Sequence, residues 1–212
     1  MRMLDLFCGA GGAAKGYYDA GFDDIVGVDI EQQRRYPYTF VLGDALEYVA
    51  RYGHLFDVIH ASPPCQKYSV MSRVNNNHYP DMIGITRCAL LVSGKPYVIE
   101  NVPGSPLINP LTLCGTMFDL KVIRHRLFEC NPPIWFAPAT CNHDTGGIPR
   151  AGYGVSTKGF ISVSGHIRNT DYARTAMGID WMTRSELVQA IPPAYTRFIG
   201  EQMISVIGRE ND

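Results

Sequence analysis

Short apolar runs alternate with longer segments of helical periodicity through the first hundred residues. Strands are predicted over residues 3–7, 25–28, 38–42, 56–61 and 97–100. Helices are predicted over residues 11–20, over a segment that opens at Asp44, and over residues 81–93. Strands that alternate with helices indicate βαβ units and a mostly parallel sheet, so the pattern predicts a doubly wound α/β core.

The pattern changes near residue 131. Six glycines lie within residues 146–165, a spacing typical of loops and short hairpins rather than helices. Helical character returns over residues 183–190, and residues 195–207 form a predicted amphipathic helix. Residues 1–130 and 177–212 are expected to form an α/β core. Residues 131–176 are expected to form a small Gly-rich lobe.

Composition allows one sizeable core, because 46% of the 212 residues are hydrophobic. The 20 acidic and 19 basic residues exclude a polybasic protein that coats nucleic acid by charge alone. The charge is nevertheless uneven: residues 121–175 hold seven basic and three acidic residues, a net charge of +4, which leaves −5 elsewhere. A basic segment on an acidic core suits a DNA cleft, although an ordinary surface lobe is also compatible with it.

The sequence predicts a soluble, intracellular protein without a membrane partner. No apolar run is long enough to cross a bilayer, and the first residues enter a strand-like segment rather than a signal peptide. The six cysteines are widely separated, unlike the disulfide framework of a small secreted domain. We therefore expect reduced thiols.

A glycine cluster follows the first predicted strand, where Gly9, Gly11 and Gly12 open the first helix. Glycines at this point let the backbone approach a ligand at the helix N-terminus, although a tight structural turn is the alternative. Asp29 and Asp44 end the second and third strands at the same sheet edge. They could accept hydrogen bonds from a ribose and an adenine amino group, or serve as a turn residue and a helix cap. The shared edge favours an adenosine-containing ligand.

Reactive side chains follow the next two strands. Cys65 comes after Pro63-Pro64, which stiffen the backbone, so it is a candidate nucleophile, with a buried structural cysteine as the alternative. Glu100 ends an apolar strand at the same edge, where it could instead cap a neighbouring element. Arg124 and Arg126 would share one face of an extended segment and grip a carboxylate, phosphate or base carbonyl, or form a solvated basic turn.

Four segments resemble, in order, the signature motifs of the C5-cytosine DNA methyltransferases. They read DLFCGAGG (5–12), SPPCQ (62–66), ENV (100–102) and RHR (124–126). The resemblance covers residues 1–130 well and residues 177–200 loosely. It implies a Rossmann-like methyltransferase core, S-adenosylmethionine as cofactor and double-stranded DNA as partner. It also suggests a monomer in the cytoplasm of a bacterium or phage-infected host, with a role in restriction-modification or genome protection.

The resemblance also implies the roles of the reactive residues. The Cys65 thiolate would add to C6 of a cytosine that has been flipped out of the duplex. Glu100 would hold N3 and the exocyclic amine, Arg126 would bind the base O2, and Arg124 would orient the thiol. The residues expected to contact DNA, for which a solvated loop is the alternative, are Gln66, Ser69 and Arg73.

The cofactor residues are likewise implied by the resemblance. Phe7 and Ile30 would pack on the two faces of the adenine. The full predicted cofactor set is Phe7, Gly9, Gly11, Gly12, Asp29, Ile30, Asp44, Ala45, Pro64 and Gln189. Gln189 stands where the family has asparagine before Ala-Val-Pro-Pro, and Val122-Ile123 stand where the family has a glutamine.

Three rival functions and one property of the lobe remain to be considered. An RNA (tRNA) cytosine-5 methyltransferase would use the same chemistry, and free deoxycytidylate is a less favoured substrate because it leaves the basic lobe without a purpose. A catalytically silent module that binds cofactor or DNA belongs to a different class, against which the intact Cys65, Glu100 and Arg126 argue. The recognition region spans only about 45 residues, so we expect a target of two to four bases.

Zinc ligation is a further question that the cysteines raise. Cys130, Cys141 and His143 offer ligands, and His166 or Cys114 could be a fourth. Because the spacing lacks a Cys-x-x-Cys pair, unlinked loop residues are favoured and no metal site is predicted.

Overall fold

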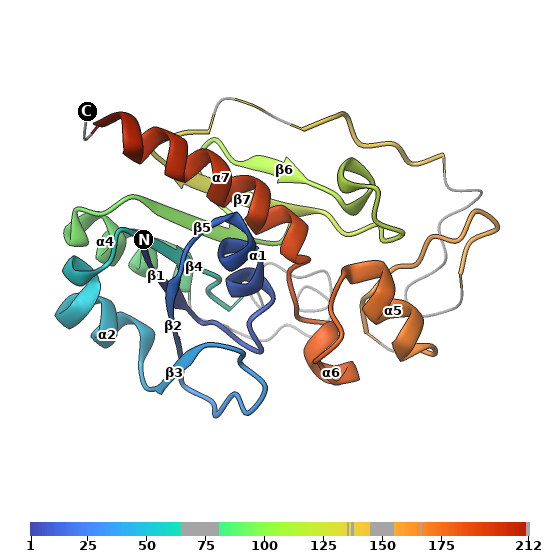
Figure 1. Ribbon diagram of the computed structural model, residues 1–212, viewed down its shortest axis with the longest axis horizontal. Helices are drawn as coiled ribbons and strands as arrows, with labels where there is room; N and C mark the ends of the chain where they lie inside the picture. Colours follow the sequence, from blue (N-terminus) through green and yellow to red (C-terminus); the bar gives the residue numbers. More distant parts are fainter. Residues whose placement is uncertain (65–80, 135, 137, 145–154, 166, 211–212) are drawn as a thin grey trace.

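The computed structural model describes residues 1–64, 81–134, 136, 138–144, 155–165 and 167–210, and Figure 1 shows its arrangement. Seven strands form one sheet in the order β3-β2-β1-β4-β5-β7-β6. Strands β1 to β5 pair in parallel, whereas β7 pairs antiparallel with both β5 and β6. The strands are β1 (Arg2–Leu6), β2 (Asp24–Asp29), β3 (Thr39–Leu42), β4 (Val58–Ala61), β5 (Tyr97–Asn101), β6 (Leu111–Leu113) and β7 (Arg126–Asn131). The predicted doubly wound α/β class is confirmed.

Helices cover both faces of the sheet. They are α1 (Gly12–Ala20), α2 (Ala45–Tyr52), α4 (Met82–Ser93), α5 (Thr170–Met177), α6 (Arg184–Leu187) and α7 (Pro193–Glu210), with 3-10 turns η1 (Gly53–Leu55) and η2 (Gly115–Phe118). Among the described residues, no helix is both long and apolar enough to span a membrane.

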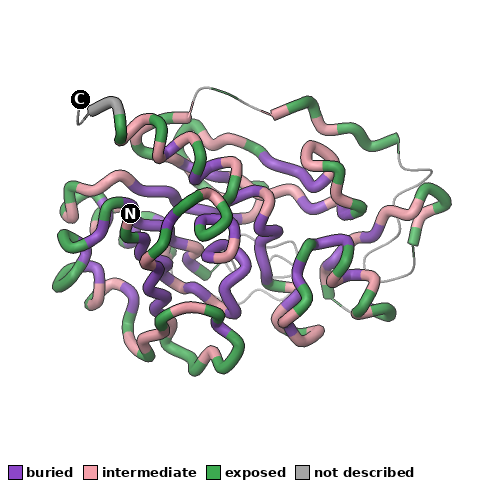
Figure 2. The backbone as a smooth tube through the Cα atoms, viewed as in Figure 1, coloured by how far each residue is buried: buried purple, intermediate pink, exposed green. Residues whose placement is uncertain are grey.

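Successive side chains along each strand point to opposite faces of the sheet, so the hydrophobic core has one part on each face. Met3 packs with α1 and α7, where Tyr17 and Tyr195 are fully buried. Its neighbour Leu4 packs on the opposite face with Leu90 of α4. Successive strand side chains point to opposite faces, so each strand serves both layers. Figure 2 shows buried positions concentrated along these central strands.

A glycine allows the close packing of α1 against α7. A Cβ built on Gly16 would lie 2.1 Å from both the Pro193 carbonyl oxygen and Thr196 Oγ1. No side chain fits at that distance, so any larger residue would push the two helices apart. Helix α7 begins at Pro193, two residues before the predicted start, because proline is well suited to a first helical turn.

The elements that the sequence pattern did not predict all lie after residue 101. Strand β6 has only three residues, and β7 is interrupted by Arg126 and Glu129, so neither shows a clear apolar alternation. Helix α5 buries mainly the small residues Ala173 and Ala176, a weak periodic signal. The helix predicted over residues 183–190 is shorter than expected, since α6 covers only Arg184–Leu187.

A third hydrophobic cluster lies outside the two sheet faces. It joins Val122, which pairs with Ile161 in an isolated bridge, to buried residues of α5 and α6. Its members fall on both sides of the boundary predicted at residues 176 and 177, since Ala176 and Met177 are both buried in it. The division into core and recognition region stays a prediction, and this cluster physically joins its two parts.

Candidate active site

Four parallel strands deliver the predicted site to one sheet edge. Strands β1, β2, β4 and β5 end at Leu6, Asp29, Ala61 and Asn101, and their carboxyl ends share that edge. Ligands in open α/β sheets bind at the carboxyl ends of the strands. The glycine turn, Asp29, the Ser62–Pro64 segment and Glu100 therefore lie along the edge where a ligand is expected.

The turn after β1 is held in an unusual backbone conformation by Asp29. Phe7, Gly9 and Gly11 have φ values of 56°, 48° and 83°, which lie in the left-handed region. The Gly9 N–H donates to Asp29 Oδ2 at 3.0 Å, and the Glu31 N–H donates to Asp29 Oδ1 at 2.9 Å. Asp29 thus fastens the turn to the end of β2, which agrees with the turn-residue alternative predicted for it.

The three glycines of the turn serve different purposes. A Cβ on Gly9 would meet no atom within 4 Å among the described residues. A Cβ on Gly11 would lie 2.6 Å from Pro37, and one on Gly12 would lie 2.5 Å from the Ile191 carbonyl oxygen. Gly11 and Gly12 are therefore required by packing within the protein, and only Gly9 borders space that a ligand could use.

Asp44 lies between β3 and α2, at the sheet edge where a ligand is expected, and it caps the helix. Asp44 Oδ1 accepts the Leu46 and Glu47 N–H groups at 2.8 and 2.9 Å, so the helix-cap alternative is correct. Ala45 is buried in the core, so its proposed contact with the cofactor stays a prediction. Ile30, directly after Asp29, is 74% exposed and offers an apolar surface at the same edge.

Glu100 and Arg126 form the charged centre of the edge. Glu100 is 5% exposed, and Arg126 Nε lies 3.0 Å from its Oε1 atom. Burial raises the pKa of the Glu100 carboxyl, against the opposing effects of the Arg126 charge, a hydrogen bond from Ser62 and the Arg124 charge. A carboxyl group with a raised pKa is more easily protonated and can then donate a hydrogen bond.

Arg124 does not share the surroundings of Arg126. It precedes β7, is buried, and donates to the carbonyl oxygen of Val163 and, at 2.8 Å, to that of Val188. The condition for a shared face, an extended segment over residues 124–126, is not met by a strand, because β7 begins only at Arg126. Arg124 anchors two distant backbone segments, and its suggested role toward the thiol stays a prediction. Burial, together with the charges of nearby His143 and Arg126, lowers the pKa of the intervening His125.

Asn101 is a site residue that the sequence analysis left without a role. Its side chain is buried, and its Nδ2 donates to the Pro63 carbonyl oxygen at 2.9 Å. This bond ties the end of β5 to the segment that leads to Cys65. Its position directly after Glu100 was the only signal available in the sequence.

A buried polar relay reaches Glu100 from helix α1. Tyr17 Oη lies 3.0 Å from His60 Nδ1, and His60 Nε2 lies 2.9 Å from Ser62 Oγ. Burial lowers the pKa of His60 to about 3, so its ring is neutral. Since Ser62 donates to Glu100, the ring must donate to Ser62 and accept from Tyr17. A histidine inside an apolar strand was the signal for this relay.

Several predicted residues lie outside the described residues or bond elsewhere. Cys65, Gln66, Ser69 and Arg73 lie outside the described part of the chain, which stops at the exposed Pro64 before them. Gln189 is exposed, and its backbone N–H donates to the Glu186 carbonyl oxygen. The roles given to these residues therefore stay predictions.

The structure brings together three of the five metal ligands considered from the sequence. Cys130 lies in β7, where burial and the charge of Glu129 raise the pKa of its thiol to about 12. His166 lies outside the described residues. Cys141 and His143 instead gather with Cys114 and His125. The expectation of unlinked loop residues is thus wrong for Cys114, Cys141 and His143, and His125 joins them without a signal in the cysteine spacing.

Comparison with known proteins finds similarity to one family in the N-terminal part of the chain. Residues 1–105 match the family model of the C-5 cytosine-specific DNA methylases. The type II methyltransferases M.XorII of Xanthomonas oryzae pv. oryzae and M.AgeI of Thalassovita gelatinovora are 29% and 27% identical over 118 and 122 residues. These matches cover 48% and 49% of this chain and 28% of each relative, so the chain spans under a third of their length.

Solved structures share the fold over almost the whole chain. A candidate DNA modification methyltransferase encoded within a prophage (E. coli) gives a TM-score of 0.63 at 15% identity, covering 98% of this chain and 99% of that one. The Dnmt2 methyltransferase of S. pombe gives 0.59 at 13% identity, with 98% and 99% covered. The resemblance read from the sequence motifs is confirmed, and so is the fold class.

Proposed function

Because residues 1–105 belong to the C-5 cytosine-specific DNA methylase family, we propose that this chain methylates C5 of cytosine in double-stranded DNA, using S-adenosylmethionine. The observation that carries the proposal is the buried Glu100–Arg126 pair at the carboxyl end of β5. It lies beside the Pro63–Pro64 segment, to which Asn101 is bonded and from which Cys65 follows. A carboxyl and a guanidinium thus lie at one edge, and we assign to the same edge the thiol of Cys65, which directly follows Pro64 in sequence.

Glu100 and Arg126 would bind the polar edge of a cytosine. The raised pKa of Glu100 favours its protonated form, which can donate to ring N3 while its other oxygen accepts from the exocyclic amine. Arg126 would donate to O2. As the Cys65 thiolate adds to C6, electron density moves toward N3, and the Glu100 proton stabilises it there. The base must be outside the duplex stack for this attack, at a cost of a few kcal/mol.

The edge also fits the proposed cofactor. The exposed Ile30 side chain offers an apolar platform beside Asp29, and Gly9 leaves open space where the turn comes closest to the edge. Asp29 and Asp44 place carboxylates at the ends of neighbouring strands β2 and β3. When bound, S-adenosylmethionine supplies an electrophilic methyl group on a sulfonium.

DNA contacts are proposed for the basic segment after β6 and for the residues after the cysteine. Residues 121–175 carry the net charge of +4, and phosphate attraction depends on such charge. We assign residues 131–176 to target recognition and Gln66, Ser69 and Arg73 to backbone or groove contacts. The small size of this region supports a short target sequence.

Methyl transfer to three substrates tests the proposal. Tritiated S-adenosylmethionine is incubated with the protein and duplex DNA, tRNA or dCMP, and label in each substrate is counted. We expect label in duplex DNA alone, and none with Cys65→Ala, whereas Cys88→Ala on the exposed side of α4 keeps full activity.

The outcomes separate the rival functions. Label in tRNA alone would replace the DNA assignment with an RNA one, and label in dCMP alone would make the substrate a nucleotide. Full activity of Cys65→Ala would refute the nucleophile. Cofactor binding without label in any substrate would identify a catalytically silent module.

A further inference from the structure

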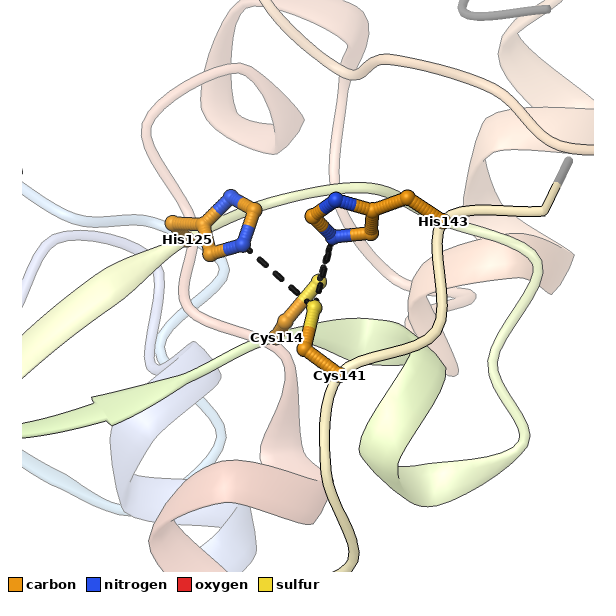
Figure 3. A group of neighbouring side chains, drawn as sticks. All are labelled: Cys114, His125, Cys141 and His143. Atoms are coloured by element: carbon orange, nitrogen blue, oxygen red, sulfur yellow. Dashed lines mark hydrogen bonds between the residues drawn. The ribbon is translucent and has the colours of Figure 1, made fainter.

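Four metal-ligand side chains meet at the end of the sheet formed by β6 and β7. Cys114 follows β6, His125 precedes β7, and Cys141 and His143 lie on the segment 138–144 (Figure 3). Their ligand atoms all lie within 4.8 Å of one another. Figure 3 shows both imidazole rings directed at the two sulfur atoms.

The distances match a tetrahedral site closely. Cys114 Sγ lies 3.7 Å from His143 Nε2, and Cys141 Sγ lies 3.5 Å from His125 Nε2. In a tetrahedral zinc site, ordinary Zn–S and Zn–N bond lengths put sulfur and nitrogen about 3.6 Å apart. Cys141 Sγ and His143 Nε2 are 2.6 Å apart, so this pair would have to open by about 1 Å around an ion.

We propose that Cys114, His125, Cys141 and His143 bind one zinc ion. Two thiolates and two neutral imidazoles form the S2N2 donor set that favours zinc, and hard cations such as Mg²⁺ and Ca²⁺ prefer oxygen. Two thiolates also balance the charge of a divalent ion. Because the protein supplies all four ligands, the ion is structural and leaves no position for substrate.

A second layer of contacts supports the sulfur ligands. Thr116 Oγ1 lies 3.5 Å from Cys114 Sγ and 3.4 Å from Cys141 Sγ. The same oxygen accepts the Asn142 N–H at 3.3 Å. Groups that hydrogen-bond to metal ligands fix their orientation and tune affinity. Thr116 therefore connects the sulfur from the sheet to the sulfur from the segment 138–144.

The proposed ion would fasten this segment to the sheet beside the active site. His125 is adjacent in sequence to Arg126, and its carbonyl oxygen accepts from Arg126 Nη1 at 2.8 Å. Arg126 in turn pairs with Glu100. An ion on His125 would thus fix the backbone that carries the base-binding arginine, and it would also hold the start of the proposed recognition region.

Metal content measured on untagged protein tests the site directly. Protein purified under reducing conditions with added zinc, then freed of excess by gel filtration, should hold about one zinc per chain by plasma mass spectrometry. Cys141→Ser and His143→Ala should lose the ion on the column, and both change partly or fully exposed side chains, so folding should persist. Cys88→Ser on α4 is the matched control and should keep the ion.

Two further measurements make the result decisive. Thr116→Val should weaken zinc affinity about tenfold in a competition with a chelator, because it removes a contact to both sulfurs. Cobalt(II) in place of zinc should give the absorption of a tetrahedral thiolate complex in wild type and not in Cys141→Ser.

Three results would overturn the proposal. They are zinc content near zero in wild type after loading, unchanged zinc content in Cys141→Ser with His143→Ala, and a Cys114–Cys141 disulfide under reducing conditions. None of these readouts depends on methyl transfer, so the metal site is tested independently of the proposed enzyme activity.

Discussion

Two glutamates in neighbouring strands are equally buried but differ in how they are bonded. Glu100 of β5 and Glu129 of β7 are 5% and 4% exposed, and each has an arginine partner. Glu129 accepts from Arg87 Nε and Nη2, both at 2.7 Å, and from the Ile108 N–H at 2.8 Å. Among the described residues, Oε1 of Glu100 accepts no hydrogen bond, although Arg126 Nε lies 3.0 Å away.

The difference in hydrogen bonding indicates that Glu129 is a structural carboxylate, whereas Glu100 can still accept a hydrogen bond from a ligand. A bidentate arginine and a backbone N–H satisfy Glu129, so its charge is compensated within the fold. Glu100 has fewer donors, and burial raises the pKa of its carboxyl. An incompletely bonded buried group is costly to the folded state, and a bound base could supply the missing partner.

Activity should distinguish the two glutamates most strongly. Glu100→Gln should lower the rate of methyl transfer about 10²–10⁴-fold, because an amide cannot supply the proton expected at N3. Glu129→Gln should keep the specific activity of its folded fraction. Single-turnover rates with duplex DNA measure both, and comparable rates for the two variants would remove the distinction.

Stability should rank the same two variants in reverse. Glu129→Gln should lower the free energy of unfolding by about 3 kcal/mol, because it leaves the Arg87 charge without its bidentate partner. Glu100→Gln should cost about 1 kcal/mol or less, since the loss of the Arg126 pair is offset by removal of a poorly compensated charge. Urea denaturation measures both. A larger loss for Glu100→Gln would contradict the assignment of Glu129 as the structural carboxylate.

The relay behind Glu100 should contribute less to stability than Glu129 does. Tyr17→Phe removes the donor to His60, leaves a buried ring nitrogen unsatisfied, and should cost about 1–2 kcal/mol of stability. Tyr18→Phe is the matched control, because Tyr18 is 51% exposed. Equal melting temperatures for the two variants would show that the relay has no energetic role.

The smallest expected effect is a pH dependence of stability. The folded-state pKa of Glu100 is raised, so the folded protein binds the proton more tightly than the unfolded chain does. The stability that Glu100 contributes is therefore present at low pH. It declines as the pH rises from the ordinary pKa of a glutamate through the raised pKa of the folded protein, by at most about 1.4 kcal/mol per pH unit.

Denaturation midpoints compared between pH 4 and pH 8 check this sign. Relative to wild type, Glu100→Gln should become more stable as pH rises, and Glu31→Gln, at an exposed position, should show no such trend. An opposite slope would mean that Glu100 is stabilised as a carboxylate.

The residues at the ends of parallel strands could be predicted from sequence. Asp29 and Glu100 each end an apolar run, and parallel strands bring their carboxyl ends to one edge whatever the loops between them do. The helix-cap alternative for Asp44 could also be recognised, because an aspartate directly before a helical segment is a local capping signal. The roles of Cys65 and its neighbours stay predictions, because they depend on residues outside the described part of the chain.

Partners that meet through distant segments could not be predicted. Arg87 and Glu129 are 42 residues apart, and no local pattern joins a residue of α4 to one of β7. The proposed metal ligands could not be predicted for the same reason. The spacing of the cysteines makes Cys130 as good a candidate ligand as Cys114, but the side chain of Cys130 packs against the core on one face of the sheet. The pairing of β7 with β5 and β6 is what brings Cys114, and not Cys130, close to His125.

The direction of β7 links the geometry of the sheet to the Glu100–Arg126 pair. Because β7 runs antiparallel to β5, its first residue lies near the last residues of β5, with Leu127 opposite Asn101. A slip of one residue would move Arg126 about 3.4 Å and turn its side chain to the other face of the sheet. Inserting one residue inside either strand would thus separate Arg126 from Glu100 with both residues unchanged, whereas the connection from β6 to β7 can vary in length. Alignment of the two strands therefore constrains the proposed active site as strictly as the identity of the two side chains does.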